Sequence, residues 1–145
     1  MGKVGVELKG YEKLVANNRK LQKELKEANR RVIIQEANNL QRVMVAKAPK
    51  GTTGRLSQSI TKRVWKDKGG VIGVVVGVKG GVEEFRVGKG KKAYYPASQE
   101  YGWEYPKGVH HPPQPFIRPA FDENVGRMKN NIIQTFRRVI NRFTS

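Results

Sequence analysis

The hydroxyl groups that follow the segment APKG are the first place in this sequence where a reaction could be catalysed. Thr53, Arg55 and Ser57 lie close together in the chain, so a hydroxyl nucleophile is one interpretation. Such a nucleophile needs a general base and a third group that orients the base, and the surrounding sequence supplies neither. We therefore interpret 49–54 as a tight loop that leads into a short helical segment over 56–60.

Two other clusters suggest metal or phosphate chemistry. His110 and His111 are the only histidines, and because the chain has no cysteine, a metal site would need further ligands that the sequence does not offer. The run GKGKK at 88–92 has the glycine and lysine of phosphate-binding loops, but it lacks the GxxxxGK[ST] spacing. The sequence thus predicts no metal, no cofactor and no nucleotide site, in a protein that is not an enzyme.

Prolines and aromatic residues are concentrated between residues 94 and 121. Proline fixes φ and pushes the preceding residue toward extended geometry, which predicts a stiff, projecting loop over 102–119. Trp103 and Tyr105 in this loop are either anchors for a protein partner or aromatic rings packed over the edge of the core. A helical pattern follows the loop and begins near Pro119.

The composition is strongly basic. Lys and Arg number 29 against 12 Asp and Glu, a formal charge of +17, which makes polyanions plausible partners. The length of 145 residues predicts a single domain over 1–145, and regular apolar spacing argues against a disordered basic chain. No stretch resembles a signal peptide or a membrane span, so we expect a soluble protein made in the cytoplasm, without membrane contact.

Apolar residues recur at intervals of three and four from Tyr11 almost to Pro49, which predicts one long amphipathic helix, or two with a bend. Alternation over 4–8 predicts a short strand before it. The polar face of the helix is basic and includes Arg30 and Arg31. We interpret this face first as a solvated helix surface, and alternatively as a surface for nucleic acid.

Beyond this helix the pattern becomes that of strands and loops. Segments 61–65 and 71–78 predict a β-hairpin, and the apolar run 74–76 predicts a central strand covered on both faces. The glycine- and lysine-rich segment 79–92 predicts a flexible excursion or a flared hairpin. Segment 93–101 is interpreted as a last strand or a strand–helix corner, and 121–143 as a second long amphipathic helix.

Three short motifs follow one another along the chain. Their residues are Ala48, Pro49, Thr53, Gly54, Leu56 and Ser59, then Glu100, Tyr101 and Gly102, and finally Pro113, Pro115, Phe116, Arg118, Pro119 and Ala120. In this order, the motifs resemble the tail-completion or head–tail joining (neck) proteins of long-tailed bacteriophages. The resemblance covers the chain from the long helix onward. The lysine-rich excursion and the two histidines depart from the family's pattern.

The resemblance implies an α+β fold with a small, mostly antiparallel sheet packed against a long N-terminal helix and a C-terminal helix. It also implies a non-enzymatic virion protein at the head–tail junction, which forms a homo-oligomeric ring, commonly a hexamer, around the DNA channel. Expected partners are connector or neck proteins and tail-tube or tail-terminator proteins. The alternative is a basic nucleic-acid-binding protein that acts through its helix surface.

Within this interpretation, two groups of residues are candidates for function. A subunit or partner interface is expected at Tyr101, Trp103, Tyr105, Pro113, Pro115, Phe116 and Arg118. Non-specific contact with DNA in the channel is expected at Lys89, Lys91, Lys92, Arg30 and Arg31. A stiff loop that lands on a neighbour would supply the head-to-tail contact that a ring requires.

Overall fold

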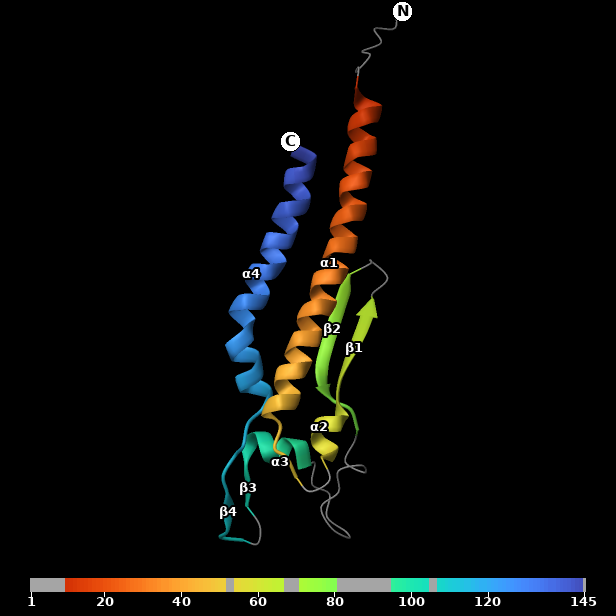
Figure 1. Cartoon of the computed structure of the whole chain (residues 1–145). Helices are drawn as coiled ribbons and strands as arrows, with labels where there is room; N and C mark the ends of the chain where they lie inside the picture. The colour runs from red at the N-terminus through yellow and green to blue at the C-terminus, as the bar shows by residue number, and fades with distance from the viewer. Residues whose placement is uncertain (1–9, 52–53, 67–70, 81–94, 105–106, 145) are drawn as a thin grey trace, which may run out of the picture.

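The computed structural model describes residues 10–51, 54–66, 71–80, 95–104 and 107–144. In chain order, the elements are α1 (Tyr11–Lys47), α2 (Arg55–Ser59), β1 (Ile60–Lys66), β2 (Ile72–Val78), α3 (Tyr95–Tyr101), β3 (Trp103–Glu104), β4 (His110–His111) and α4 (Ile117–Thr144). Figure 1 shows α1 as the central element, with α4 along one side of it and the β1–β2 hairpin along the other. The predicted α+β class is therefore confirmed.

α1 is one continuous helix of 37 residues, so the single long helix is the correct one of the two predicted alternatives. At about 1.5 Å per residue, it is about 55 Å long. The helix ends at Lys47 because Ala48 is extended (φ −60°, ψ 134°), the geometry favoured directly before a proline such as Pro49. The Ala48 N–H still donates to the Met44 carbonyl oxygen at 2.9 Å.

α4 runs antiparallel to α1 (Figure 1). Three ion pairs fix the register between the two helices within the described residues: Lys47 Nζ to Glu123 Oε1 at 2.8 Å, Arg127 Nη1 to Glu36 Oε2 at 3.0 Å, and Arg142 Nη1 to Glu24 Oε2 at 3.9 Å. As residue numbers rise along α4, those of their partners fall along α1. The first turns of α1 extend beyond the end of α4, and Tyr11 and Leu14 are exposed there.

The middle ion pair contains a buried charge. Glu36 is only 2% exposed, and its Oε1 accepts a hydrogen bond from Asn131 Nδ2 at 2.7 Å. Its Oε2 has no hydrogen bond of good geometry, so the Arg127 guanidinium at 3.0 Å is the compensation for burying that oxygen. A buried carboxylate that loses its cation is costly, because the interior solvates an unpaired charge poorly.

Arg127→Ala is therefore expected to lower the free energy of unfolding by about 2–3 kcal/mol. This is below the roughly 3–5 kcal/mol typical of a fully buried pair, because the Arg127 side chain is 44% exposed and water can reach the site. Urea unfolding followed by circular dichroism measures the change. Arg137→Ala, an exposed arginine on the same helix, is the matched control and should change stability by less than about 0.5 kcal/mol. Equal effects of the two variants would contradict this account of Glu36.

β1 and β2 form the predicted antiparallel hairpin, with Ile60 opposite Val78 and Lys66 opposite Ile72. The prediction of a central strand covered on both faces is wrong. Among the described residues β1 is the only strand paired with β2, so β2 is not central, and one of its faces is exposed at Val75. Val76 and Val78 pack on the core, whereas Val75 points the other way and is 58% exposed. The apolar run at 74–76 therefore spans both faces of a two-stranded ribbon, of which one face packs on α1.

The main hydrophobic core lies at the end of the molecule where α1 finishes and α4 starts. Its buried residues are Leu40, Met44, Ala48, Leu56, Ile60, Phe116 and Ala120. They come from the last turns of α1, from α2, from the first residue of β1 and from the start of α4. The core therefore joins segments that are far apart in sequence.

The short helical segment predicted over 56–60 is confirmed as α2. Of the two alternatives for 93–101, the strand is wrong over 95–101, where helix α3 (Tyr95–Tyr101) forms, and residues 93–94 lie outside the described part of the chain. The predicted strand at 4–8 and nearly all of the excursion at 79–92 lie outside the described residues. Within the described residues, no helix is long and apolar enough to cross a membrane.

Candidate partner-binding site

A sharp turn after α3 begins the candidate site. Gly102 has φ +77°, in the left-handed region that favours glycine, and its N–H donates to the Ser98 carbonyl oxygen at 2.9 Å. A Cβ added at Gly102 would lie 2.8 Å from the carbonyl oxygen of His111 and 3.2 Å from Pro113. The turn thus brings the chain so close to its returning segment that only glycine fits.

A short hairpin follows the turn and projects from the end of the molecule (Figure 1). Trp103 is paired with His111, and their rings are stacked with centroids 3.9 Å apart and an interplanar angle of 7°. The Gly108 N–H donates to Glu104 Oε1 at 2.8 Å, which closes the loop between the strands. The Trp103–His111 stack gives one of the two histidines a structural role. No group of three metal-ligating side chains occurs in the described part of the chain.

The proline-rich return strand lies against α3. The Gln114 N–H donates to the Gln99 carbonyl oxygen at 2.7 Å, while Pro113 and Pro115 on either side are exposed. The end of this proline-rich segment is therefore fixed to the molecule's own surface. Phe116 comes directly after it and is 0% exposed, in the core.

Glu100 ties α3 to the start of α4. One carboxylate oxygen, Oε2, accepts hydrogen bonds from the N–H groups of Phe116 at 2.9 Å and Ile117 at 3.0 Å, and Oε1 accepts one from Arg118 at 2.9 Å. Unsatisfied N–H groups and the helix dipole both favour an anion at a helix N-terminus. Glu100 thus acts as the N-terminal cap of α4, although it lies 16 residues before Phe116.

The carboxyl group of Glu100 is held in its ionised form. Burial raises its pKa, but the hydrogen bonds from Ile117, Arg118 and Phe116 and the positive charge of Arg118 lower it. The net result is a pKa below the ordinary value of 4.5. The cap is therefore charged at neutral pH.

An open groove of about 390 Å³ lies between α3 and the first turn of α4. Pro96, Ile117 and Val78 contribute apolar walls. Tyr101 and Phe121 also line the groove and are 72% and 47% exposed, so two aromatic rings are available to a partner. The groove and the β3–β4 hairpin occupy the same end of the molecule.

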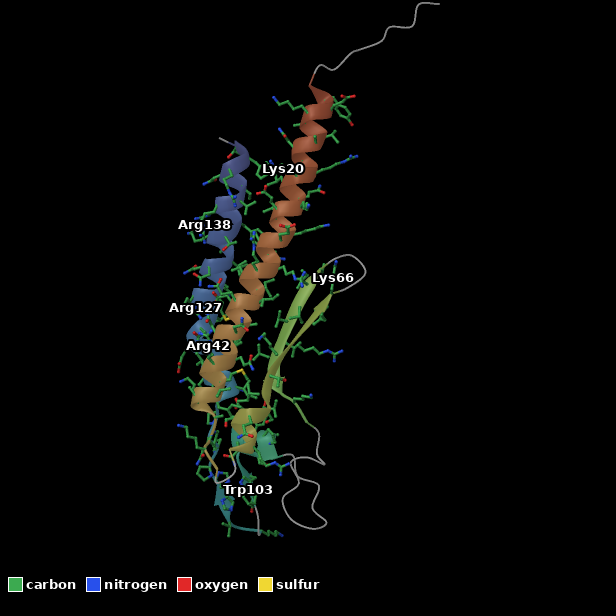
Figure 2. The ribbon with its side chains drawn as sticks, turned by 45° about the vertical axis from the view of Figure 1, so that its right-hand side comes forward. Lys20, Arg42, Lys66, Trp103, Arg127 and Arg138 are labelled. Atoms are coloured by element: carbon green, nitrogen blue, oxygen red, sulfur yellow. The ribbon has the colours of Figure 1, made fainter. Side chains whose placement is uncertain are left out.

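The structure brings together part of the predicted interface. Tyr101 and Arg118 line the groove, Trp103 lies on the hairpin at the lower end of Figure 2, and Pro113 and Pro115 are exposed on the return strand. Tyr105 lies outside the described residues. Phe116 belongs to the core and has no exposed surface, so we leave it out of the proposed interface.

Six residues that line the groove were not among the predicted interface residues: Val78, Pro96, Ala97, Glu100, Ile117 and Phe121. Phe121 was assigned to the apolar stripe of the C-terminal helix. Helical spacing could have indicated the position of Phe121. Phe116 and Ala120, four residues apart, lie on one face of the helix start, whereas Ile117 and Phe121 lie on the neighbouring face. Only the first pair is buried.

The other candidate residues are dispersed. Arg30 is exposed on α1, and Arg31, one residue later, lines a second groove between α1 and α4. Lys89, Lys91 and Lys92 lie outside the described residues, as does Thr53. The hydroxyl group of Ser57 donates to the Gly54 carbonyl oxygen at 2.9 Å, which supports a structural role in the turn before α2.

The described surface offers an open, largely apolar groove beside a projecting hairpin. Residues 12–105 match the family described as "Bacteriophage HK97-gp10, putative tail-component". The chain belongs to this family, which confirms the resemblance to phage tail and neck proteins seen in the motifs. No curated protein and no solved structure matches the chain. The family match covers α1 to β3 and ends before the proline-rich return and α4.

Proposed function

We propose that this protein is a structural component of the virion that joins head to tail in a long-tailed phage, as a homo-oligomeric ring around the DNA channel. The family match supports the role of a phage tail component. The main structural support for the joining role comes from the hydrogen bonds of Glu100. They connect α3 to the start of α4 and thereby place the groove beside the projecting β3–β4 hairpin.

The groove fits a contact with a neighbouring subunit. A ring needs head-to-tail contacts, in which one surface of each subunit meets a different surface of the next. Exposed aromatic residues and arginine at the rim of an apolar groove are the residue types that dominate binding energy at protein interfaces, and Tyr101, Phe121 and Arg118 supply them. Trp103 and the exposed prolines extend the same surface toward a connector, tail-tube or tail-terminator protein.

Tyr101→Ala is expected to abolish most head–tail joining and leave the subunit folded. Truncation of a central aromatic residue costs about 2 kcal/mol or more at an interface, which is about thirtyfold in association. In phage that lack the wild-type gene, complementation with this variant should yield DNA-filled heads and free tails by electron microscopy, with joined particles reduced at least about tenfold. The melting temperature should stay within about 3 °C of wild type, because the side chain is mostly exposed.

Tyr11→Ala provides the matched control. Tyr11 is also an exposed tyrosine on a helix, but it lies at the opposite end of α1 from the groove (Figure 1). Joining should be normal in this variant. Normal joining by the Tyr101 variant as well would remove the groove from the interface and overturn this proposal.

A further inference from the structure

A second groove, of about 270 Å³, lies between α1 and α4 in the half of the helix pair away from the core. Ala28, Val32 and Val139 are its buried residues, and Arg31, Arg138 and Arg142 line it from both helices. Figure 2 shows Arg138 in the upper part of α4, far from Trp103 at the lower end of the molecule. This arginine groove is therefore separate from the candidate partner-binding site.

The three arginines are poorly neutralised by the protein itself. Arg142 is 3.9 Å from Glu24, at the limit of an ion pair, and its side chain is 67% exposed. Arg138 uses its Nε–H to donate to the Gln134 carbonyl oxygen of its own helix at 3.3 Å, which leaves its terminal nitrogens for another ligand. No acidic side chain in the described residues forms an ion pair with Arg31 or Arg138. Arg127, earlier on the same helix, is by contrast paired with Glu36.

This arrangement is unfavourable unless an anion is present. Arg138 and Arg142 are four residues apart, and like charges at this spacing destabilise a helix. Arg31 adds a third cation from the opposite wall. Guanidinium groups bind phosphate through two parallel hydrogen bonds, and a helical step of four residues offsets two of them by about 6 Å along the groove, which suits successive phosphates of one strand.

We propose that the arginine groove binds backbone phosphates of DNA, without sequence preference. The biological setting rests on the proposed function, since a ring around the DNA channel would hold many copies of this groove near the duplex. Arg31 was a candidate from the sequence, but Arg138 and Arg142 join it only because α1 and α4 pack antiparallel in this register. The groove is thus a composite site made by two helices.

The test replaces all three arginines with glutamine: Arg31→Gln, Arg138→Gln and Arg142→Gln. The control is Lys62→Gln, Arg63→Gln and Lys66→Gln, three exposed cations on β1. Both variants reduce the formal charge from +17 to +14, because each loses three positive charges. Binding to a fluorescent 20-base-pair duplex is measured by anisotropy over a range of NaCl concentrations, and circular dichroism checks the fold.

For the groove variant, the slope of log K against log salt should become shallower by about 2–3, since each phosphate contact contributes about 0.9. Affinity at low salt should fall by at least about tenfold, whereas the control should lose less than about threefold. The melting temperature of the groove variant should stay close to that of wild type, because the repulsion removed between Arg138 and Arg142 offsets the loss of the long, exposed Arg142–Glu24 pair.

Three outcomes would overturn the proposal: equal losses in both variants, which would mean that only total charge matters; unchanged binding in the groove variant; or stronger competition by poly-glutamate than by unlabelled duplex, which would indicate an acidic protein ligand. Tyr101→Ala should bind duplex DNA like wild type. A failure of DNA binding therefore leaves the joining assay unaffected, and the two proposals can fail separately.

Discussion

Phe116→Ala is expected to lower the free energy of unfolding by about 3–5 kcal/mol, the usual cost of removing a fully buried phenylalanine ring. Phe116 is 0% exposed and belongs to the cluster in which α1, α2, β1 and α4 meet, so few neighbours can move to fill the space it leaves. A loss of this size is a large part of the 5–15 kcal/mol that holds a typical domain folded. Urea unfolding should show a much lower midpoint with a similar slope.

The matched control for this prediction is Phe121→Ala, which removes the same side chain five residues later. Phe121 is 47% exposed on the rim of the groove, so the loss should be about 1 kcal/mol or less. The two variants separate a structural role from a surface role for two phenylalanines that lie five residues apart. Similar, small losses in both would mean that Phe116 is not in the core.

The placement of Phe116 shows what the proline-rich segment could and could not predict. Prolines fix local backbone geometry. They do not fix the direction in which the strand runs, which depends on the hydrogen bond between Gln114 and Gln99 and on the turn at Gly102. The local geometry of the prolines therefore placed Phe116 in the predicted interface, whereas tertiary contacts bury its ring in the core.

Long amphipathic segments were the most predictable part of the fold. The three- and four-residue spacing in α1 and α4 reflects burial of one face along their whole length, so periodicity alone identifies them. The environment of β2 was harder to predict, because three consecutive valines are compatible both with a central strand and with a two-stranded ribbon that has one exposed face. The number of strands beside it decides between these, and neighbouring valines carry no information about that number.

The start of α4 was expected near Pro119, because proline suits a first helical turn, and Pro119 does lie in the first turn of the helix that begins at Ile117. The group that caps this helix, by contrast, could not be predicted. No Ser, Thr, Asp or Asn stands at the usual capping position before it. The cap is Glu100, which comes from another helix and cannot be recognised by local spacing.

The arginine groove depends on tertiary structure in the same way. Arg31 was recognised from the sequence as part of a basic helix face. Arg138 and Arg142 lie in the last turns of the helix predicted over 121–143, where cations complement the helix dipole. Only the antiparallel register, fixed by the pairs from Lys47–Glu123 to Glu24–Arg142, places the three side chains around one groove.

Glu100→Ala is expected to cost about 3 kcal/mol, because it leaves three backbone N–H groups without their acceptor at once. An unsatisfied buried donor costs about 1–3 kcal/mol, and the Phe116 N–H is buried whereas those of Ile117 and Arg118 can be partly reached by water. Glu104→Ala, which removes an exposed carboxylate that accepts one backbone N–H from Gly108, should cost less than about 1 kcal/mol.

The pH dependence of stability tests the charge on this cap. The pKa of Glu100 is lowered by folding, so the unfolded chain binds a proton more readily than the folded one as pH falls below the ordinary value of 4.5. The stability contributed by the ionised carboxylate is therefore fully present above about pH 5.5, and is lost as pH falls through the lowered pKa. Glu100→Gln, which cannot titrate and presents a donor in place of one acceptor, should be less stable than wild type at pH 7 and lose less on acidification. Parallel pH profiles for wild type and Glu100→Gln would show that the cap does not hold α4 as a charged group.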